Sequence, residues 1–183
     1  MKLYVIRHGQ TDWNKEYKVQ GHTDIPLNEN GISMAKKAHD DYKDMRFDIC
    51  YCSPLTRARQ TAEYLLEGRD IDIIIDDRLQ EVSFGDYEGN QKIFQYPNHP
   101  LHAFFKDPAN YVTADSAESF DHLYARTGSF LEEHVYPHMD EDINILIVGH
   151  GAMNLSIINR IKNIPISNFW DNMQKNCEIM ELL

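Results

Sequence analysis

Two segments, LYVIRHG (residues 3–9) and ILIVGHG (residues 145–151), share one pattern: a short apolar run followed by a histidine and a glycine. A continuous apolar run of this length is typical of a strand that is buried on both faces, as in parallel sheets. Parallel strands end at the same edge of a sheet, where open α/β folds bind ligands. We therefore expect His8 and His150 to converge if the two strands are neighbours. A single strand-end histidine is more often structural, and the repetition of the pattern favours a function.

Apolar runs alternate with helical patterns along the rest of the chain. Further strands are predicted at residues 47–52, 71–75 and 178–183, and helices at residues 29–44, 53–67 and 152–161. In the second helix, Ser53 is the expected N-cap and Pro54 the first helical residue. No repeat or linker interrupts the pattern, so residues 1–183 are expected to form a single domain. The predicted fold is an α/β three-layer sandwich with a mostly parallel central sheet flanked by helices.

The stretch from about residue 88 to residue 142 departs from this alternation. It begins with a loop rich in proline and aromatic residues and continues with an amphipathic helix that ends near Pro137. We interpret it as a small lid insertion, because long excursions in α/β enzymes often shape the substrate pocket. An extra packing helix without ligand contact is the alternative. Five lid aromatics could wall a pocket for a ring-containing substrate, or could only pack the lid: Phe94, Tyr96, Phe104, Phe105 and Tyr111.

Composition narrows the choice of partners. The 183 residues carry 18 Lys and Arg against 29 Asp and Glu, a formal net charge of −11. Nucleic acids and anionic membranes select basic surfaces, so neither is the expected partner. No apolar run approaches the roughly 20 residues of a membrane span, and the N-terminus lacks a signal-peptide pattern. The three cysteines form neither an even framework nor a CxxC pair, so reduced thiols and a cytoplasmic location are expected.

A third candidate for the sheet edge is SPLTRAR (residues 53–59), at the start of a predicted helix. Free N–H groups and the helix dipole favour an anion at such a position. Arg57 and Arg59 lie about 200° apart on a helix, so both are not expected to face one ligand. The helical wheel does not choose between them, although it places Arg59 nearer the apolar side.

Five blocks of sequence together resemble the histidine phosphatase superfamily, the phosphoglycerate mutase-like proteins. They occur in the order of the family across nearly the whole chain. The first is RHG (7–9) with Thr11, Trp13 and Asn14, and the second is Gln20-Gly21 followed by DIPLN (24–28) and Gly31. The others are SPL (53–55) with RA (57–58) and QTA (60–62), LQE (79–81) with FGDYEG (84–89), and VGHG (148–151).

The resemblance implies a role for each matching residue. His8 is the implied nucleophile that becomes phosphohistidine, which splits a very slow hydrolysis into two easier steps. Arg7, Arg57 and a protonated His150 are the implied clamp on the phosphoryl oxygens. Glu81 is the implied acid that protonates the leaving group and then the base that activates water. The remaining residues expected at the substrate are Asn14, Gln20, Ser53 and Gly151. No metal or cofactor is implied.

Within the family, the sequence favours a phosphatase over a mutase. The mutases are typically longer and carry additional arginines for a second anionic group, whereas residues 82–149 contain only Lys92, Lys106 and Arg126 as permanent cations. The FGDYEG block resembles the phosphatase branch, although Tyr87 replaces its usual tryptophan. Residues 152–154 depart from the more frequent Gly and Arg pattern. Phosphoglycerate mutase-type transfer is the alternative reaction, and a non-catalytic phosphate-binding regulatory protein is the alternative class.

Two further hypotheses concern metals and partners. His99 with His102, and His134 with His138, have spacings seen in metal sites, but no cysteine or carboxylate pattern accompanies them. The expected partner is a small-molecule phosphomonoester. A homodimer is possible because many members of the family associate, but no sequence feature demonstrates it.

Overall fold

The computed structural model describes residues 1–183 and contains one five-stranded sheet with the order β3-β2-β4-β1-β5. The strands are β1 (Lys2–Arg7), β2 (Ile49–Cys52), β3 (Ile73–Ile75), β4 (Asn144–Gly149) and β5 (Ile179–Glu181). The first four run parallel to one another, and β5 pairs antiparallel with β1 at one edge. The predicted mostly parallel sheet is therefore confirmed, with shorter strands at 49–52, 73–75 and 179–181 than the apolar runs indicate.

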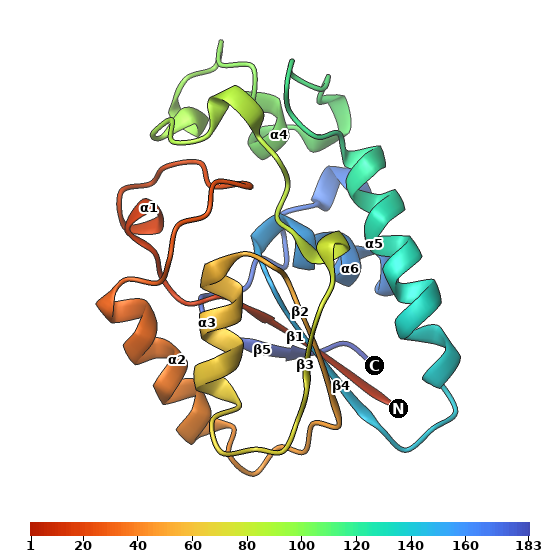
Figure 1. Ribbon diagram of the computed structural model, residues 1–183. Coiled ribbons are helices and arrows are strands. Elements are labelled where there is room, and N and C mark those ends of the chain that lie inside the picture. The colour runs from red at the N-terminus through yellow and green to blue at the C-terminus, as the bar shows by residue number, and fades with distance from the viewer.

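Alternate residues of the two central strands face opposite layers of helices. Leu3 and Val5 belong to the core beneath α5 (Phe120–His134) and α6 (Gly151–Ile161). Tyr4 and Ile6 belong to the core beneath α2 (Glu29–Asp41) and α3 (Thr56–Leu65). Figure 1 shows these two helix pairs on opposite sides of the sheet. Because both faces are covered, the central strands read as continuous apolar runs, and the three-layer sandwich is confirmed.

The start of α3 corrects one sequence expectation. The helix begins at Thr56 with Leu55 at the N-cap, so Ser53 is not the cap and Pro54 is not the first helical residue. The Thr56 N–H instead donates to the Asp24 carboxylate at 2.8 Å, and the Thr56 hydroxyl donates to the same carboxylate at 2.6 Å. An acceptor from a distant loop thus replaces the local cap. It also ties the loop before α2 to the start of α3.

The segment from residue 88 to residue 142 divides into two parts. The first contains the short helix α4 (His102–Lys106) and lies beyond the carboxyl edge of the sheet, whereas α5 packs beside α6 in the helix layer (Figure 1). Phe104 joins the two parts, because its ring stacks on Phe120 at a centroid distance of 4.6 Å. The lid expectation therefore describes the first part, and the packing-helix alternative describes α5.

The remaining elements are short. The helix α1 (Asp12–Lys15) follows the Thr11 cap, and six 3₁₀ turns complete the chain: η1 (Asp77–Leu79), η2 (Gly85–Tyr87), η3 (Ile93–Gln95), η4 (Pro108–Asn110), η5 (Tyr136–His138) and η6 (Ile166–Asn168). None of the helices is both long enough and apolar enough to cross a bilayer.

A close backbone contact joins α2 to the segment after β1. A Cβ atom on Gly31 would lie 2.0 Å from the Gln10 carbonyl oxygen, and neither backbone can yield without moving the residues next to His8. We expect Gly31→Ala to lower the free energy of unfolding by about 2–3 kcal/mol, as overpacking does. Gly68→Ala is the control, because its Cβ would meet nothing within 4 Å and only its φ of +74° is unfavourable. That strain costs about 1–2 kcal/mol. Urea denaturation measures both; a loss for Gly31→Ala no greater than the control would contradict the contact.

Candidate active site

The two strand-end histidines meet at the carboxyl edge of the sheet. β1 pairs with β4 so that Arg7 lies opposite Gly149. His8 is the residue directly after β1, and His150 is the residue directly after β4. Their ring centroids are 5.2 Å apart, and both side chains are buried. The convergence expected from the repeated sequence pattern is therefore present.

One hydrogen bond fixes the proton of His8. The Nδ1 atom lies 2.6 Å from the Gly9 carbonyl oxygen, which can only accept, so Nδ1 carries the hydrogen and Nε2 keeps its lone pair. Burial, and then the positive charges of Arg57 and Arg7, hold the pKa of His8 well below its usual value of 6.5. His8 is thus a neutral imidazole with a free nitrogen in a site dominated by positive charge.

His150 is neutral as well, with the opposite tautomer. Arg57 Nε donates to His150 Nδ1 at 3.2 Å, and a guanidinium cannot accept, so the proton resides on Nε2 and points to Ser53 Oγ at 2.7 Å. Burial, followed by Arg57 and His8, lowers the pKa of His150 well below 6.5. The protonated form expected in the phosphoryl clamp remains a prediction: an anion against the ring would offset the cost of burying an imidazolium.

Arg57, and not Arg59, is the buried arginine of α3. Arg57 is 0% exposed, whereas Arg59 faces solvent. Its Nη2 donates to the Gly21 carbonyl at 2.7 Å and its Nη1 to the Thr23 carbonyl at 3.1 Å. Burial lowers the pKa of Arg57 to about 10, which leaves it charged at neutral pH. The helical wheel is a poor guide here because loop carbonyls, rather than apolar side chains, cover this residue.

Two buried donors beside His8 have no acceptor. Arg7 donates through Nη1 to the Gln174 carbonyl at 3.0 Å, but its Nε has no partner. Gln20 Oε1 accepts from the Thr11 hydroxyl at 2.8 Å, and Gln20 Nε2 has no partner. Both residues, together with Asn14, line the same cavity as His8. Unpaired buried N–H groups are costly, and a cluster of them beside a cation is suited to an anionic ligand.

Glu81 holds the N-terminus of α6 at the side of this cavity. Its Oε1 accepts from the backbone N–H of Val82 and of Met153, each at 2.9 Å, and its Oε2 accepts from Ala152 at 3.1 Å. The carboxylate is 7% exposed and lines the cavity with His8 and Gly151. A Cβ on Gly151 would lie 3.5 Å from Glu81 Oε2. That distance is an ordinary van der Waals contact, so the carboxylate does not require a glycine here.

The cavity has a volume of about 220 Å³, and its lining residues divide into a polar set, called the polar or phosphate end, and an apolar set, called the apolar chamber. The polar end contains Arg7, His8, Asn14, Gln20 and Glu81. The remainder of the wall is largely apolar and comes from the 17–19 segment, the residue before η2, the lid and the segment after α6: Tyr17, Val19, Phe84, Ile93, Phe94, Phe105, Trp170 and Met173. A polar set of residues suited to a small anion and a largely apolar set thus line the same cavity.

The sequence identified only part of this wall. Among the five lid aromatics, Phe94 and Phe105 line the cavity, Phe104 lies in the core, and Tyr96 and Tyr111 are not among the lining residues. Trp170 stacks on Phe105 at 5.2 Å and was not predicted, because no motif or periodicity marks the segment after α6.

Three residues expected at the site stand behind the cavity wall. Ser53, Arg57 and His150 form a buried hydrogen-bonded row next to His8 and do not line the cavity. Ser53 therefore contacts His150 in this structure. The histidine pairs considered for metal binding do not form a cluster: no group of three or more His, Cys, Asp or Glu side chains is placed to hold a metal ion.

Comparison with known proteins agrees with this geometry. The sequence profile of the histidine phosphatase superfamily (branch 1) matches residues 3–183. The chain belongs to this superfamily. It is 33% identical over 172 residues to the adenosylcobalamin/alpha-ribazole phosphatase of Salmonella typhimurium, covering 93% of this chain and 84% of that protein. It is 27% identical over 173 residues to phosphoserine phosphatase 1 of Hydrogenobacter thermophilus, covering 93% and 80%.

A solved structure is similarly close to this histidine phosphatase. Bacillus stearothermophilus YhfR superposes with a TM-score of 0.89 at 30% identity, covering 98% of this chain and 89% of that chain. The family resemblance predicted from the five sequence blocks is therefore confirmed.

The two neutral histidines make the stability of this histidine phosphatase sensitive to acid. Their pKa values are lowered by folding, so below about pH 6.5 the unfolded chain binds protons that the folded chain excludes. The free energy of unfolding therefore decreases as the pH is lowered. Above pH 6.5 both states are neutral and the effect is absent. We expect His8→Asn to flatten the loss between pH 6.5 and pH 5 by up to about 1.4 kcal/mol per pH unit. Urea denaturation across this range measures it, and an unchanged slope would show that His8 binds its proton equally well in both states.

Proposed function

We propose that this protein hydrolyses phosphomonoesters through a phosphohistidine intermediate on His8. The observation that carries the proposal is the fixed tautomer of His8: Nδ1–H bonds to the Gly9 carbonyl, and the nucleophilic Nε2 is kept free and neutral. The unpaired Arg7 Nε and Gln20 Nε2 beside it provide a place for phosphoryl oxygens. A neutral nucleophile and held positive charge are the requirements of this reaction.

In the proposed first step, His8 Nε2 attacks phosphorus, the ester P–O bond breaks, and protonated Glu81 gives its proton to the leaving oxygen. In the second step, water attacks the phosphohistidine while the Glu81 carboxylate takes a proton from it, and the N–P bond breaks. Arg7 and Arg57 stabilise the charge on the phosphoryl oxygens, and Asn14 and Gln20 donate to the same group. We assign His150 the role of a positioning residue: its neutral ring donates to Ser53 Oγ and accepts from Arg57 Nε, and so orients Arg57.

The cavity supports a substrate whose leaving group has an apolar or ring-containing part. Phe105 and Trp170 form a stacked wall beyond the phosphate end, and Lys18 is the only cation besides Arg7 among the lining residues. Lys18 itself is paired with Glu16 at 2.6 Å. A substrate carboxylate or second phosphate would therefore find few free positive partners. This favours hydrolysis of an apolar monoester over mutase chemistry and over small charged substrates.

The first experiment tests the nucleophile. We expect His8→Ala to lower phosphate release from a panel of monoesters by about 10³-fold or more, as loss of a covalent nucleophile does. All assays contain EDTA, because the proposed positive charge comes from arginines. Arg59→Ala is the control and is expected to retain full activity, because Arg59 is exposed on α3, the helix that carries Arg57. Rapid interconversion of 3- and 2-phosphoglycerate with little free phosphate would support a mutase instead.

The second experiment tests the apolar chamber. We expect kcat/KM to be higher for phenyl and naphthyl phosphate than for phosphoserine, and Phe105→Ala to lower the aryl values by about 10-fold through KM. That change corresponds to the roughly 1–3 kcal/mol of a buried aromatic contact. Tyr96→Ala, on an exposed lid position outside the cavity, is the matched control. Equal effects of both substitutions on aryl esters, or a preference for phosphoserine, would contradict the assignment.

A further inference from the structure

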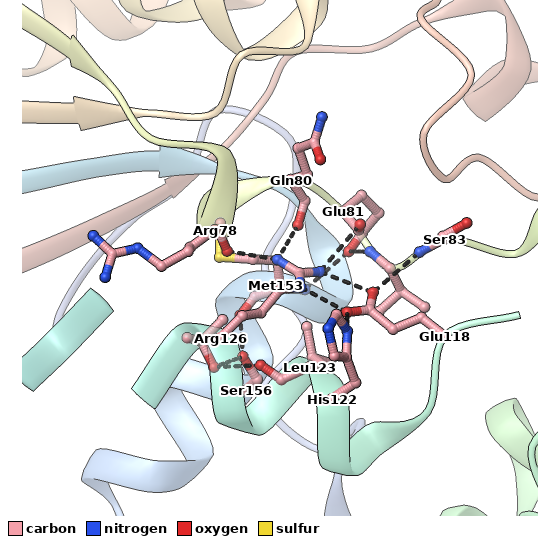
Figure 2. A network of polar contacts seen from close by, with 12 residues as sticks. Arg78, Gln80, Glu81, Ser83, Glu118, His122, Leu123, Arg126, Met153 and Ser156 are labelled. Carbon is pink, nitrogen blue, oxygen red and sulfur yellow. Dashed lines mark hydrogen bonds and ion pairs between the residues drawn. The ribbon is translucent and has the colours of Figure 1, made fainter. Parts of the chain in front are cut away.

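Arg126 in α5 uses every one of its five N–H groups on the segment around Glu81 and on Glu118 (Figure 2). Nη1 donates to the carbonyls of Arg78 at 2.5 Å and Gln80 at 2.7 Å. Nη2 donates to the Glu81 carbonyl at 3.2 Å. The remaining two groups, one on Nε and one on Nη2, form a bidentate pair with the Glu118 carboxylate at 2.7 and 3.0 Å. No donor of this side chain is left for solvent or substrate.

Glu118 extends the contact to the other side of Glu81. Its carboxylate also accepts from the Ser83 N–H at 3.2 Å, and its own backbone N–H donates to the Ser83 carbonyl at 2.7 Å. His122 Nδ1 contacts the same carboxylate at 2.6 Å. Burial by itself would raise the pKa of Glu118, but hydrogen bonds and charge from Arg126 hold it below its usual value. The pair is therefore ionised at neutral pH.

The hydrogen bonds of Arg126 and Glu118 hold a segment that lies outside regular secondary structure. Residues 80–84 belong to no helix or strand, so neither a helix nor a sheet fixes the backbone of Glu81. The Glu81 carboxylate nevertheless accepts from the backbone N–H groups of Ala152 and Met153 at the N-terminus of α6, as well as from that of Val82, which requires its Cα to be placed accurately. Removing the guanidinium would leave the carbonyls of Arg78 and Gln80 without a partner and the buried Glu118 carboxylate without its counter-charge. The Glu81 carbonyl would keep only its contact with His22 Nε2 at 2.8 Å.

We propose that Arg126, paired with Glu118, is a positioning residue for Glu81: it sets where the carboxyl group stands relative to His8 and the leaving group. Arg126 does not line the cavity, so it acts through the backbone of residues 78–81. The inference rests on the proposed function, in which Glu81 delivers a proton to the leaving oxygen. Loss of Arg126 then impairs the steps in which Glu81 moves a proton and spares substrate binding.

The dependence on the leaving group separates this role from a general structural one. p-Nitrophenolate departs without much help from an acid, whereas the alkoxide of 2-phenylethyl phosphate needs a proton as the bond breaks. Both esters carry a ring for the same apolar chamber. The quantity measured is kcat/KM, because it reports the steps up to release of the alcohol and excludes hydrolysis of the phosphohistidine.

We expect Arg126→Gln to lower kcat/KM for 2-phenylethyl phosphate by about 10–100-fold, through kcat, because proton transfer contributes effects of this order. For p-nitrophenyl phosphate we expect a change smaller than about 3-fold on the same grounds. Glu118→Gln is expected to give the same pattern. Arg126→Lys is expected to restore part of the activity, because an ammonium keeps the positive charge but cannot make the bidentate hydrogen bonds of a guanidinium. These two variants carry the test if Arg126→Gln does not fold.

The matched control is Arg160→Gln. Arg160 also joins two helices, donating from α6 to the Tyr124 carbonyl of α5 at 2.7 Å, but it does not contact residues 78–83. We expect it to affect both esters equally, and weakly. In a Glu81→Gln background, adding Arg126→Gln is expected to cause no further loss with the alkyl ester, because the two changes remove the same proton transfer.

Two results would overturn the inference while leaving the phosphatase intact: equal losses for both esters in the Arg126 and Glu118 variants, or losses that multiply with those of Glu81→Gln. A wild-type protein that releases phosphate from neither ester, or a His8→Ala variant that retains full release, would instead overturn the proposed function itself and the inference with it.

Discussion

The buried guanidinium of Arg57 is the constraint on which the rest of the site depends. Its direct hydrogen-bond partners are the carbonyls of Gly21 and Thr23 and the ring of His150, and all three are neutral. A cation buried among neutral acceptors keeps its full charge, and in a dry environment that charge acts strongly on its neighbours. Together with burial, which is the larger cause, it lowers the pKa of both histidines, so the site holds two cations, Arg7 and Arg57, and two neutral imidazoles.

The loop that receives this guanidinium is itself held by carboxylates at a distance. Glu88 accepts the backbone N–H groups of His22 and Thr23, and also that of Phe84, while Asp24 accepts from the start of α3. These anions contribute to keeping Arg57 charged without neutralising it by contact. The arrangement explains how a chain of net charge −11 offers a pocket for an anion. Acidic residues organise the loops around the pocket, and the few cations are placed where the phosphoryl group is proposed to bind.

The sequence was sufficient for the sheet and for the residues at its edge. Repeated apolar runs predict β1 and β4, and their parallel pairing places His8 and His150 together without further information. It was insufficient wherever burial is polar or the contact is long-range. The wheel placed Arg59 nearer the apolar side, because it registers apolarity and cannot register the carbonyls that cover Arg57.

Ser53 and Arg126 show the same limit in different ways. Ser53 has the local signature of an N-cap, yet it bonds to a histidine 97 residues away while a distant aspartate caps the helix. The sequence marks Arg126 only as one of few cations in its region, and its function depends on carbonyls 45–48 residues earlier in the chain. No local pattern encodes such contacts.

Glu81 stands where three parts of the fold meet: its carboxylate lies at the N-terminus of α6, its backbone carbonyl accepts from Arg126 of α5, and Phe84 lies nearby in the apolar wall. Because Arg7 and His8 stand at the end of β1 while Ile93, Phe94 and Phe105 of the apolar wall come from the lid, the substrate can change with the lid while His8 and Arg57 stay as they are. Glu81 lines the cavity with both sets of residues, and its backbone is held from outside the cavity, by Arg126 of α5 and by His22.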